Sequence, residues 1–303
     1  MPEKIPTFFI VGAPKSGTTA VYQFLRAHPQ VFMPNFKEPN FFCADFCATY
    51  PYAVRDQGMY LSLFSAASAE TQIGEASVWY LYSREAAAAI RRFNPDARII
   101  AMLRNPVDAM HSLHAQRLWS GNEDIHDFRK ALEAECDRSR GRRLPPAVQI
   151  PEGTLYRRVF RYAEQLQRYI DVLGRDKIHV VIYDDFRALP DETYREILRF
   201  LGVEDAFQPQ FQVINSRRRI RSSRLHGLML RPPKAVQRTM QLVLPPEFRA
   251  KVYWRIMDAV VAKKGGAPLD PELRAELTEE CAPDIGRLGD LLGRDLTFWL
   301  RKP

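Results

Sequence analysis

The sequence lacks any apolar run long enough to cross a bilayer, and its first residues show no basic segment followed by an apolar one. We therefore expect no membrane span, and the cytoplasm is the expected compartment. It also lacks paired C-x-x-C clusters, since its four cysteines are Cys43, Cys47, Cys136 and Cys281. Because this spacing fits neither a zinc site nor a disulfide framework, we predict reduced thiols.

Acidic residues are too few to balance the basic ones, because 36 Asp and Glu oppose 44 Lys and Arg and leave a net charge of +8. This excess favours an anionic partner, such as a nucleotide, a sulfated or phosphorylated sugar, a nucleic acid or a lipid surface. A chain of 303 residues with 46% hydrophobic residues can bury a substantial core, and no internal repeat is present.

Apolar β-branched runs alternate with segments of helical period, which is the pattern of an α/β fold with a parallel sheet covered by helices on both faces. The expected strands are residues 7–11, 72–75, 98–103 and 178–183. The expected helices are residues 17–27, 84–93, a segment that starts at 105–106, 154–173 and 191–201. Residues 120–146 are expected to be irregular, either as an insertion over the site or as a solvated loop. From about residue 225 the pattern turns helical and basic. We therefore expect a single domain of residues 1–303, in which residues 225–265 form a helical lid or an acceptor-side subregion.

The first expected strand leads into "GAPKSGTT", residues 12–19, which is similar to a phosphate-binding loop with its lysine displaced. In a nucleoside triphosphatase the pattern is G-x-x-x-x-G-K-[ST]. Here Gly12 and Gly17 have the right spacing, but Thr18 stands in the lysine position and Lys15 lies inside the loop. Amides and hydroxyls at a helix N-terminus still bind an anion, and Lys15 would face the bridging oxygens of a diphosphate-sized group.

The strand expected at 98–103 is followed by Arg104, where a triphosphatase often has an aspartate that holds Mg²⁺. An arginine there binds an anion directly. Because ligands bind at the carboxyl ends of parallel strands, we expect residues 12–17 and Arg104 to converge. An ATP-dependent kinase is the competing enzyme hypothesis, since "VVIYDD" at 180–185 offers acidic residues at a strand end. The lysine and the arginine are both misplaced for it.

These motifs resemble those of the sulfotransferases that use 3′-phosphoadenosine 5′-phosphosulfate (PAPS). Within that family, the sequence resembles bacterial members that are similar to the glycan and heparan branch. "PKSGTT" at 14–19 resembles the family's 5′-phosphosulfate loop, and Arg104 with Ser112 resembles its 3′-phosphate pair. The resemblance continues through "KEPNFF", "GEASVWYL", "EGTLYRRVFRYAEQL", "IHVVIYDDF", "ILRFLGV" and "LLGRDLTFWL". Only residues 120–150 and 205–265 lack clear counterparts.

The resemblance implies a P-loop-like fold, PAPS as the co-substrate and no required metal. The residues it places at the donor are Lys15, Ser16, Gly17, Thr18, Thr19, Lys37, Arg104 and Ser112. Lys15 would also act in catalysis, by stabilising the charge that grows on the leaving phosphate.

The hydroxyl acceptor must lose a proton to a base. "KEPNFF" resembles the motif of the glycan-sulfating branch in which the glutamate is the proposed base, so Glu38 is the candidate and Lys37 its companion. The alternative is a surface charge pair beside two buried phenylalanines. His111 and His114 are the next candidates and are expected to have structural roles. Heparan-type enzymes have a lysine in their "E-K-[ST]-P" stretch where this sequence has Ala76, so a heparan-like acceptor is not assumed.

The basic run "NSRRRIRSS" at 215–223 lies where the family has a loop that closes over the 3′-phosphate. Its candidate ligands, which the sequence does not rank, are Arg217, Arg218 and Arg219. A competing hypothesis is a binding protein for nucleic acid or an anionic membrane. It leaves both nucleotide motifs unexplained, so we expect no nucleic-acid partner, whereas peripheral membrane contact through 242–264 stays open.

The expected acceptor is a carbohydrate hydroxyl, and the alternative is a hydroxylated lipid or secondary metabolite. Aromatic residues near the motifs either line an acceptor pocket or belong to the core; they are Phe41, Phe42, Trp79 and Tyr80.

Overall fold

The computed structural model describes residues 4–47, 50, 52–209, 219–220, 261–262 and 268–301. The chain forms two compact units, of which the first comprises residues 1–110, 157–214 and 272–303, and the second residues 111–156 and 215–271. The side chains of Arg217, Arg218 and Arg219 and nearly all of the proposed lid at 225–265 lie outside the described residues. No helix in the described part of the chain is long and apolar enough to span a membrane.

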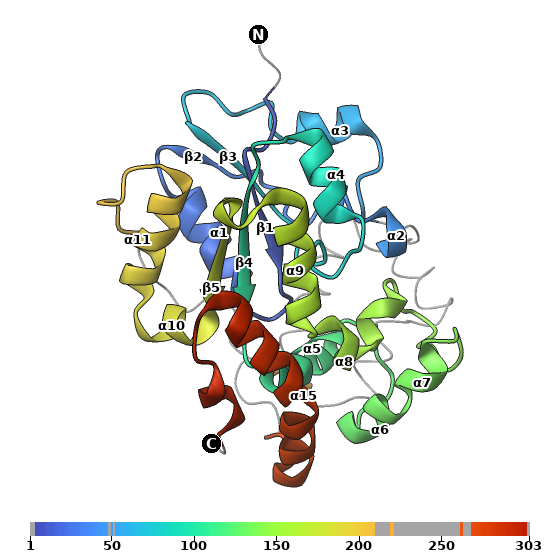
Figure 1. The fold of residues 1–303 in the computed structure, drawn as a ribbon. Coiled ribbons are helices and arrows are strands. Elements are labelled where there is room, and N and C mark those ends of the chain that lie inside the picture. Colours follow the sequence, from blue (N-terminus) through green and yellow to red (C-terminus); the bar gives the residue numbers. More distant parts are fainter. Residues whose placement is uncertain are drawn as a thin grey trace, which may run out of the picture. The chain divides into compact units, whose positions relative to one another are not determined.

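The first unit is built on a five-stranded parallel sheet of order β2-β3-β1-β4-β5 (Figure 1). The strands are β1 (Phe8–Gly12), β2 (Val31–Phe32), β3 (Gln72–Ala76), β4 (Arg98–Leu103) and β5 (Ile178–Ile182). All five residues of β1 are buried, as expected for the central strand of a sheet covered on both faces. The four predicted strands are thus confirmed, and the α/β fold class with them.

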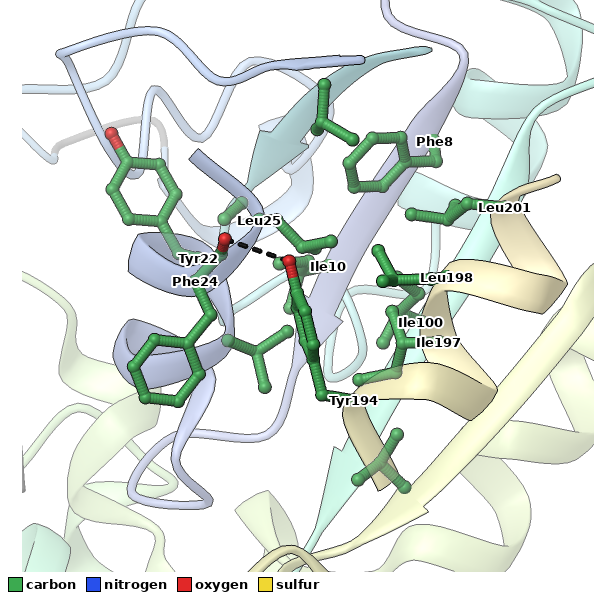
Figure 2. Close-up of a cluster of buried hydrophobic side chains, with 14 of the residues drawn as sticks. Phe8, Ile10, Tyr22, Phe24, Leu25, Ile100, Tyr194, Ile197, Leu198 and Leu201 are labelled. Carbon is green, nitrogen blue, oxygen red and sulfur yellow. Dashed lines mark hydrogen bonds between the residues drawn. The ribbon is translucent and has the colours of Figure 1, made fainter. Parts of the chain in front are cut away.

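One face of the sheet is covered by α1 (Thr18–Arg26), α10 (Tyr183–Ala188) and α11 (Pro190–Leu201). Their apolar side chains form one core cluster with strand residues such as Ile10 and Ile100 (Figure 2). Tyr194 of α11 links this helix to α1, because its hydroxyl donates to the carbonyl of Phe24 over 3.0 Å. This packing fixes α1, and therefore the loop that precedes it, against the sheet.

The opposite face carries α3 (Gln57–Ser62), α4 (Ala86–Phe93) and α9 (Tyr162–Leu173) (Figure 1). Phe42 packs edge-to-face on Phe9 of the central strand, on Tyr60 of α3 and on Phe93 of α4. The short helix α2 (Ala44–Cys47) follows this segment. These aromatic contacts anchor the chain after residue 36 to the sheet.

The single helix predicted over 154–173 is wrong, because the chain forms η1 (Pro151–Thr154), α8 (Tyr156–Val159) and α9. Arg161 has a non-helical backbone and precedes α9. The Asp284 carboxylate accepts a hydrogen bond from the Ala163 amide at 3.4 Å and so stabilises a new helix start. A short turn, η2 (Arg175–Lys177), then leads into β5.

The C-terminal segment of the first unit consists of α15 (Pro271–Leu292) and η3 (Thr297–Leu300). Arg274 of α15 forms an ion pair with Asp108 at 2.6 Å, and the carbonyl of Trp299 accepts a hydrogen bond from Asn105 at 3.0 Å. A helical C-terminal region therefore packs on the residues that follow β4.

The second unit contains most of α5 (Pro106–Trp119), with α6 (Phe128–Glu133), α7 (Glu135–Arg138) and the antiparallel pair β6 (Arg219–Ile220) and β7 (Val261–Ala262). The prediction that 120–146 is irregular was therefore wrong in part. Buried Glu123 accepts two hydrogen bonds of 2.6 Å from Arg138 and one of 2.7 Å from Tyr156. Burial raises the pKa of Glu123, but the hydrogen bonds from Arg138, the Ile125 amide and Tyr156, together with the charge of Arg138, outweigh burial and lower the pKa to about 2.

Candidate functional site

The loop between β1 and α1 is shaped by two glycines. At Gly12 a Cβ atom would lie 2.8 Å from the carbonyl oxygen of Val78, so no other residue fits this close approach. Gly17 has φ 87° and caps α1, and a Cβ there would lie 3.0 Å from the ring of Tyr183. Both positions therefore require glycine, as the spacing of the motif predicted.

The loop ends in an anion-binding arrangement. The first backbone amides of α1, at Thr18 and Thr19, have no acceptor within the helix, and the helix dipole is positive there. Lys15 precedes them with φ 64°, a left-handed conformation that is uncommon for a lysine and typical of functional loops. The hydroxyl of buried Ser16 points to the carbonyl of Pro14 at 3.5 Å. The loop thus combines a cation with amides and hydroxyls.

Arg104, at the end of β4, lies at the same loop. Its guanidinium donates to the carbonyl oxygen of Lys15 at 3.2 Å and lies 4.8 Å from the centre of the Tyr183 ring. Asp108, the nearby acid that would otherwise neutralise it, is paired with Arg274 instead. The predicted convergence of residues 12–17 with Arg104 is therefore present, and Tyr183 is a site residue that the sequence did not single out.

Lys37 and Glu38 form an ion pair of 2.6 Å, with side chains 17% and 33% exposed. Both side chains are therefore partly buried. Glu38 has φ 65°, and its amide donates to the carbonyl of Ala76 at 2.9 Å. The backbone at Glu38 is therefore locally strained, and strain of this kind is often found at functional sites.

The Sulfotransferase domain family matches residues 6–217, more than half of the chain. The protein belongs to this family. A crystal structure of a sulfotransferase from Alicyclobacillus acidocaldarius is 30% identical and superposes with a TM-score of 0.74 over 98% of this chain and 99% of that one. The protein is thus a sulfotransferase, and its central sheet has the expected fold.

Two curated relatives are larger proteins. Bifunctional heparan sulfate N-deacetylase/N-sulfotransferase 4 of Mus musculus is 27% identical over 213 residues, and carbohydrate sulfotransferase 15 of Mus musculus is 25% identical over 271 residues. The alignments cover 66% and 71% of this chain but only 23% and 48% of those relatives. The chain therefore spans at most about half the length of either relative.

The acidic strand end on which the kinase hypothesis depended has other partners in this sulfotransferase. Asp184 accepts a hydrogen bond from the indole of Trp299 at 2.9 Å, and Asp185 accepts one from Arg294 at 2.7 Å. Both carboxylates thus fasten the C-terminal segment to the end of β5. Among the described residues, no three His, Cys, Asp or Glu side chains gather as a metal site.

The two histidines considered as alternative bases have structural environments in the second unit. The His114 ring bonds the carbonyl of Ile125 at 2.9 Å and packs on Phe128, and burial lowers its pKa. The His111 ring packs on the same phenylalanine at 5.5 Å. Ser112 lies between them on α5. That Ser112 and Arg104 would bind one phosphate remains a prediction.

Tyr162, the first residue of α9, is a second site residue to which the sequence assigned no role. Its hydroxyl is buried next to the side chain of Ser16 and the backbone of Arg104. Burial raises its pKa, and these two neighbours oppose the shift. In the described part of the chain, this hydroxyl has no hydrogen bond of ordinary geometry. The Tyr162 hydroxyl lies next to the phosphate loop.

The aromatic residues near the motifs belong mainly to the core. Phe42, Trp79 and Tyr80 are buried, and half-buried Phe41 stacks on Tyr60 with ring centres 4.2 Å apart. Of the two interpretations of these residues, core packing is the one that the contacts favour.

Proposed function

We propose that this sulfotransferase moves the sulfuryl group of PAPS to a hydroxyl of an acceptor, within one functional domain of residues 1–303. The observation that carries the proposal is the contact between Arg104 and Lys15, which joins a strand-end cation to a glycine loop at a helix N-terminus. Two phosphate-binding elements side by side suit a donor with both a 5′-phosphosulfate and a 3′-phosphate.

The loop residues fit PAPS because the phosphate and sulfate oxygens of this molecule accept hydrogen bonds, and the loop offers several N–H and O–H groups close together. The amides of Gly17, Thr18 and Thr19 and the hydroxyls of both threonines would hold the 5′-phosphate, with Ser16 assisting. Lys15 would stabilise the negative charge that develops on this phosphate as its bond to sulfur breaks. A sulfuryl group carries less charge than a γ-phosphoryl group, so no metal is required in this scheme.

Arg104 would hold the 3′-phosphate through two parallel hydrogen bonds, because its ion-pairing capacity is not taken by Asp108. Ser112 would add one further hydrogen bond. The arginines of the run at 215–223 would close over the same phosphate; these are Arg217, Arg218 and Arg219.

Glu38 would act as the base. The acceptor oxygen attacks sulfur as its proton passes to the Glu38 carboxylate, and the bond between sulfur and the 5′-phosphate oxygen breaks in line. The products are a sulfate ester and adenosine 3′,5′-bisphosphate. Lys37, 2.6 Å from the carboxylate, would orient it and would contact the donor.

A carbohydrate is the proposed acceptor, because both curated relatives carry carbohydrate or heparan sulfate in their names. A hydroxylated lipid or secondary metabolite is the alternative. The test is transfer of radiolabelled sulfate from PAPS to a panel of glycans, hydroxylated lipids and phenols. Labelled glycan supports the carbohydrate assignment, labelled lipid or phenol only would correct the acceptor, and no transfer to any class would contradict the function.

A further inference from the structure

The carboxyl group of Glu75 is fully buried at the end of β3, and the proposed reaction assigns it no role. Three hydroxyls donate to it: Ser77 to Oε1 at 2.6 Å, and Tyr80 and Tyr60 to Oε2 at 2.7 and 3.1 Å. A buried carboxylate is tolerated only when such donors replace its water. The question is what this arrangement holds in place.

Two of the three hydroxyls also bind the segment 37–42 that contains Glu38. The Ser77 hydroxyl accepts a hydrogen bond from the Asn40 amide at 3.1 Å, and the Tyr80 hydroxyl accepts one from the Phe42 amide at 3.3 Å. An ionised carboxylate only accepts, so each hydroxyl must turn its proton toward Glu75 and its lone pairs toward the amides. The buried charge therefore orients both hydroxyls as acceptors for this segment.

The segment needs this support because its backbone is strained. Glu38 has φ 65° and Asn40 has φ 50°, both in the left-handed region that non-glycine residues avoid. The Asn40 side chain donates to the Glu38 carbonyl at 2.8 Å, and the Glu38 amide donates to Ala76 at 2.9 Å. The main chain of Glu38 is thus fixed from both sides by groups attached to β3 and to Asn40.

The same stretch after β3 is fastened to the phosphate loop. The Ser77 amide donates to the carbonyl of Ile10 at 3.1 Å, and the Leu81 amide donates to the carbonyl of Val11 at 2.8 Å. Gly12 lies against the Val78 carbonyl, too close for any Cβ. Residues 75–81 therefore connect the base segment to the loop that would hold the donor.

We propose that Glu75 is a positioning residue that, through Ser77 and Tyr80, fixes segment 37–42 and so sets the place of Glu38 relative to the phosphate loop. The inference rests on the proposed role of Glu38 as the base. The ionised form of Glu75 is the one that orients both hydroxyls. In the neutral form one carboxyl oxygen donates, so one of the three hydroxyls must accept from Glu75 instead of turning its proton toward it.

Ser77→Ala and Tyr60→Phe form a matched pair of variants. Each removes one donor to Glu75, but only Ser77 also accepts from the base segment, whereas Tyr60 keeps its ring contacts in the phenylalanine variant. Hydrogen exchange read by mass spectrometry over residues 37–42 and 12–19 separates local from global effects. Tyr80→Phe serves as a second variant if Ser77→Ala does not fold.

We expect Ser77→Ala to speed exchange at 37–42 by about ten- to a hundredfold, the effect of losing one buried hydrogen bond, while 12–19 changes little. Tyr60→Phe should leave both regions near the wild type after correction for global stability. Equal exchange over 37–42 in the two variants would overturn the inference.

A kinetic comparison adds a measurement that a purely structural role would not change. Calorimetry with adenosine 3′,5′-bisphosphate should give the same affinity for Ser77→Ala as for the wild type, whereas turnover from PAPS to the acceptor found in the panel should fall about tenfold or more. Parallel losses of affinity and turnover would overturn the inference. Failure of the proposed function is distinguished from this, because it appears in the wild type as absence of bisphosphate binding.

Discussion

The guanidinium of Arg104 lies over the ring of Tyr183 at 4.8 Å and donates to the carbonyl of Lys15, while Asp108, four residues further on, is bound by Arg274. Asp108 therefore pairs with Arg274 and not with Arg104. A cation at a strand end without a local acid is suited to bind a phosphate from solution.

Arg104→Ala should weaken binding of adenosine 3′,5′-bisphosphate by about ten- to a hundredfold, since a hydrogen bond to a charged group contributes about 1.5–3 kcal/mol. Adenosine 5′-monophosphate, which lacks the 3′-phosphate, should bind both proteins alike. Calorimetry with the two ligands measures this. Asp108→Asn is the control, because it breaks a partly exposed ion pair and should leave both affinities unchanged. Equal losses for the two ligands in Arg104→Ala would remove this residue from the 3′-phosphate site.

Gly17→Ala should lower both stability and donor affinity. A side chain at φ 87° costs about 1–2 kcal/mol, and the added Cβ would also displace the Tyr183 ring from 3.0 Å. Gly141 is a matched control, because it has φ 73° and nothing within 4 Å of its would-be Cβ. Thermal unfolding and bisphosphate affinity are measured for both variants. If Gly141→Ala weakened the ligand as much as Gly17→Ala, the loss would not come from the loop.

Much of the first unit could be predicted from sequence because its strands are continuous apolar runs bounded by clear turn signals. The strand β2 has only two residues and leaves no pattern to detect. The break before α9 depends on Asp284, more than a hundred residues further along the chain, and so no local signal marks it. Tertiary contacts of this kind override local propensity.

The candidate site divides in the same way. The positions of Gly12, Lys15 and Gly17 in the loop could be predicted, since they depend on spacing within one short segment. That Arg104 does not pair with Asp108 could not be predicted, because Asp108 is bound by Arg274, which lies far along the chain. Glu75 lies within a motif, but its importance comes from hydroxyls of three other residues that only the folded chain brings to it.

Glu75→Gln should change how stability depends on pH. Burial raises the pKa of Glu75 to about 7, against opposing hydrogen bonds from Ser77, Tyr80 and Tyr60 and the charge of Lys37. The folded protein thus holds a proton between pH 4.5 and pH 7 that the unfolded chain releases, and stability falls as pH rises through this window.

The size of this effect is about 3 kcal/mol across the window. Urea unfolding at pH 4.5 and pH 7.5 should show that loss in the wild type relative to Glu75→Gln, in which the titrating group is absent. Parallel pH profiles for the two proteins would contradict the assignment of the titration to Glu75.

Glu38→Gln should reduce turnover by about 10²–10⁴ while bisphosphate affinity is kept, because the amide preserves the shape and removes the base. The measurement is initial-rate transfer of labelled sulfate at saturating PAPS, with calorimetry on the same preparation. Retention of most of the turnover would assign proton removal to another group.

The central claim is that the loop and Arg104 bind a 3′-phosphorylated adenosine donor rather than ATP. Calorimetric titration in the presence of a chelator tests it most directly. The account predicts that adenosine 3′,5′-bisphosphate binds without any divalent metal, and that ATP with Mg²⁺, in a parallel titration without chelator, competes poorly for the site. Tight Mg²⁺-dependent binding of ATP, together with no binding of the bisphosphate, would contradict it.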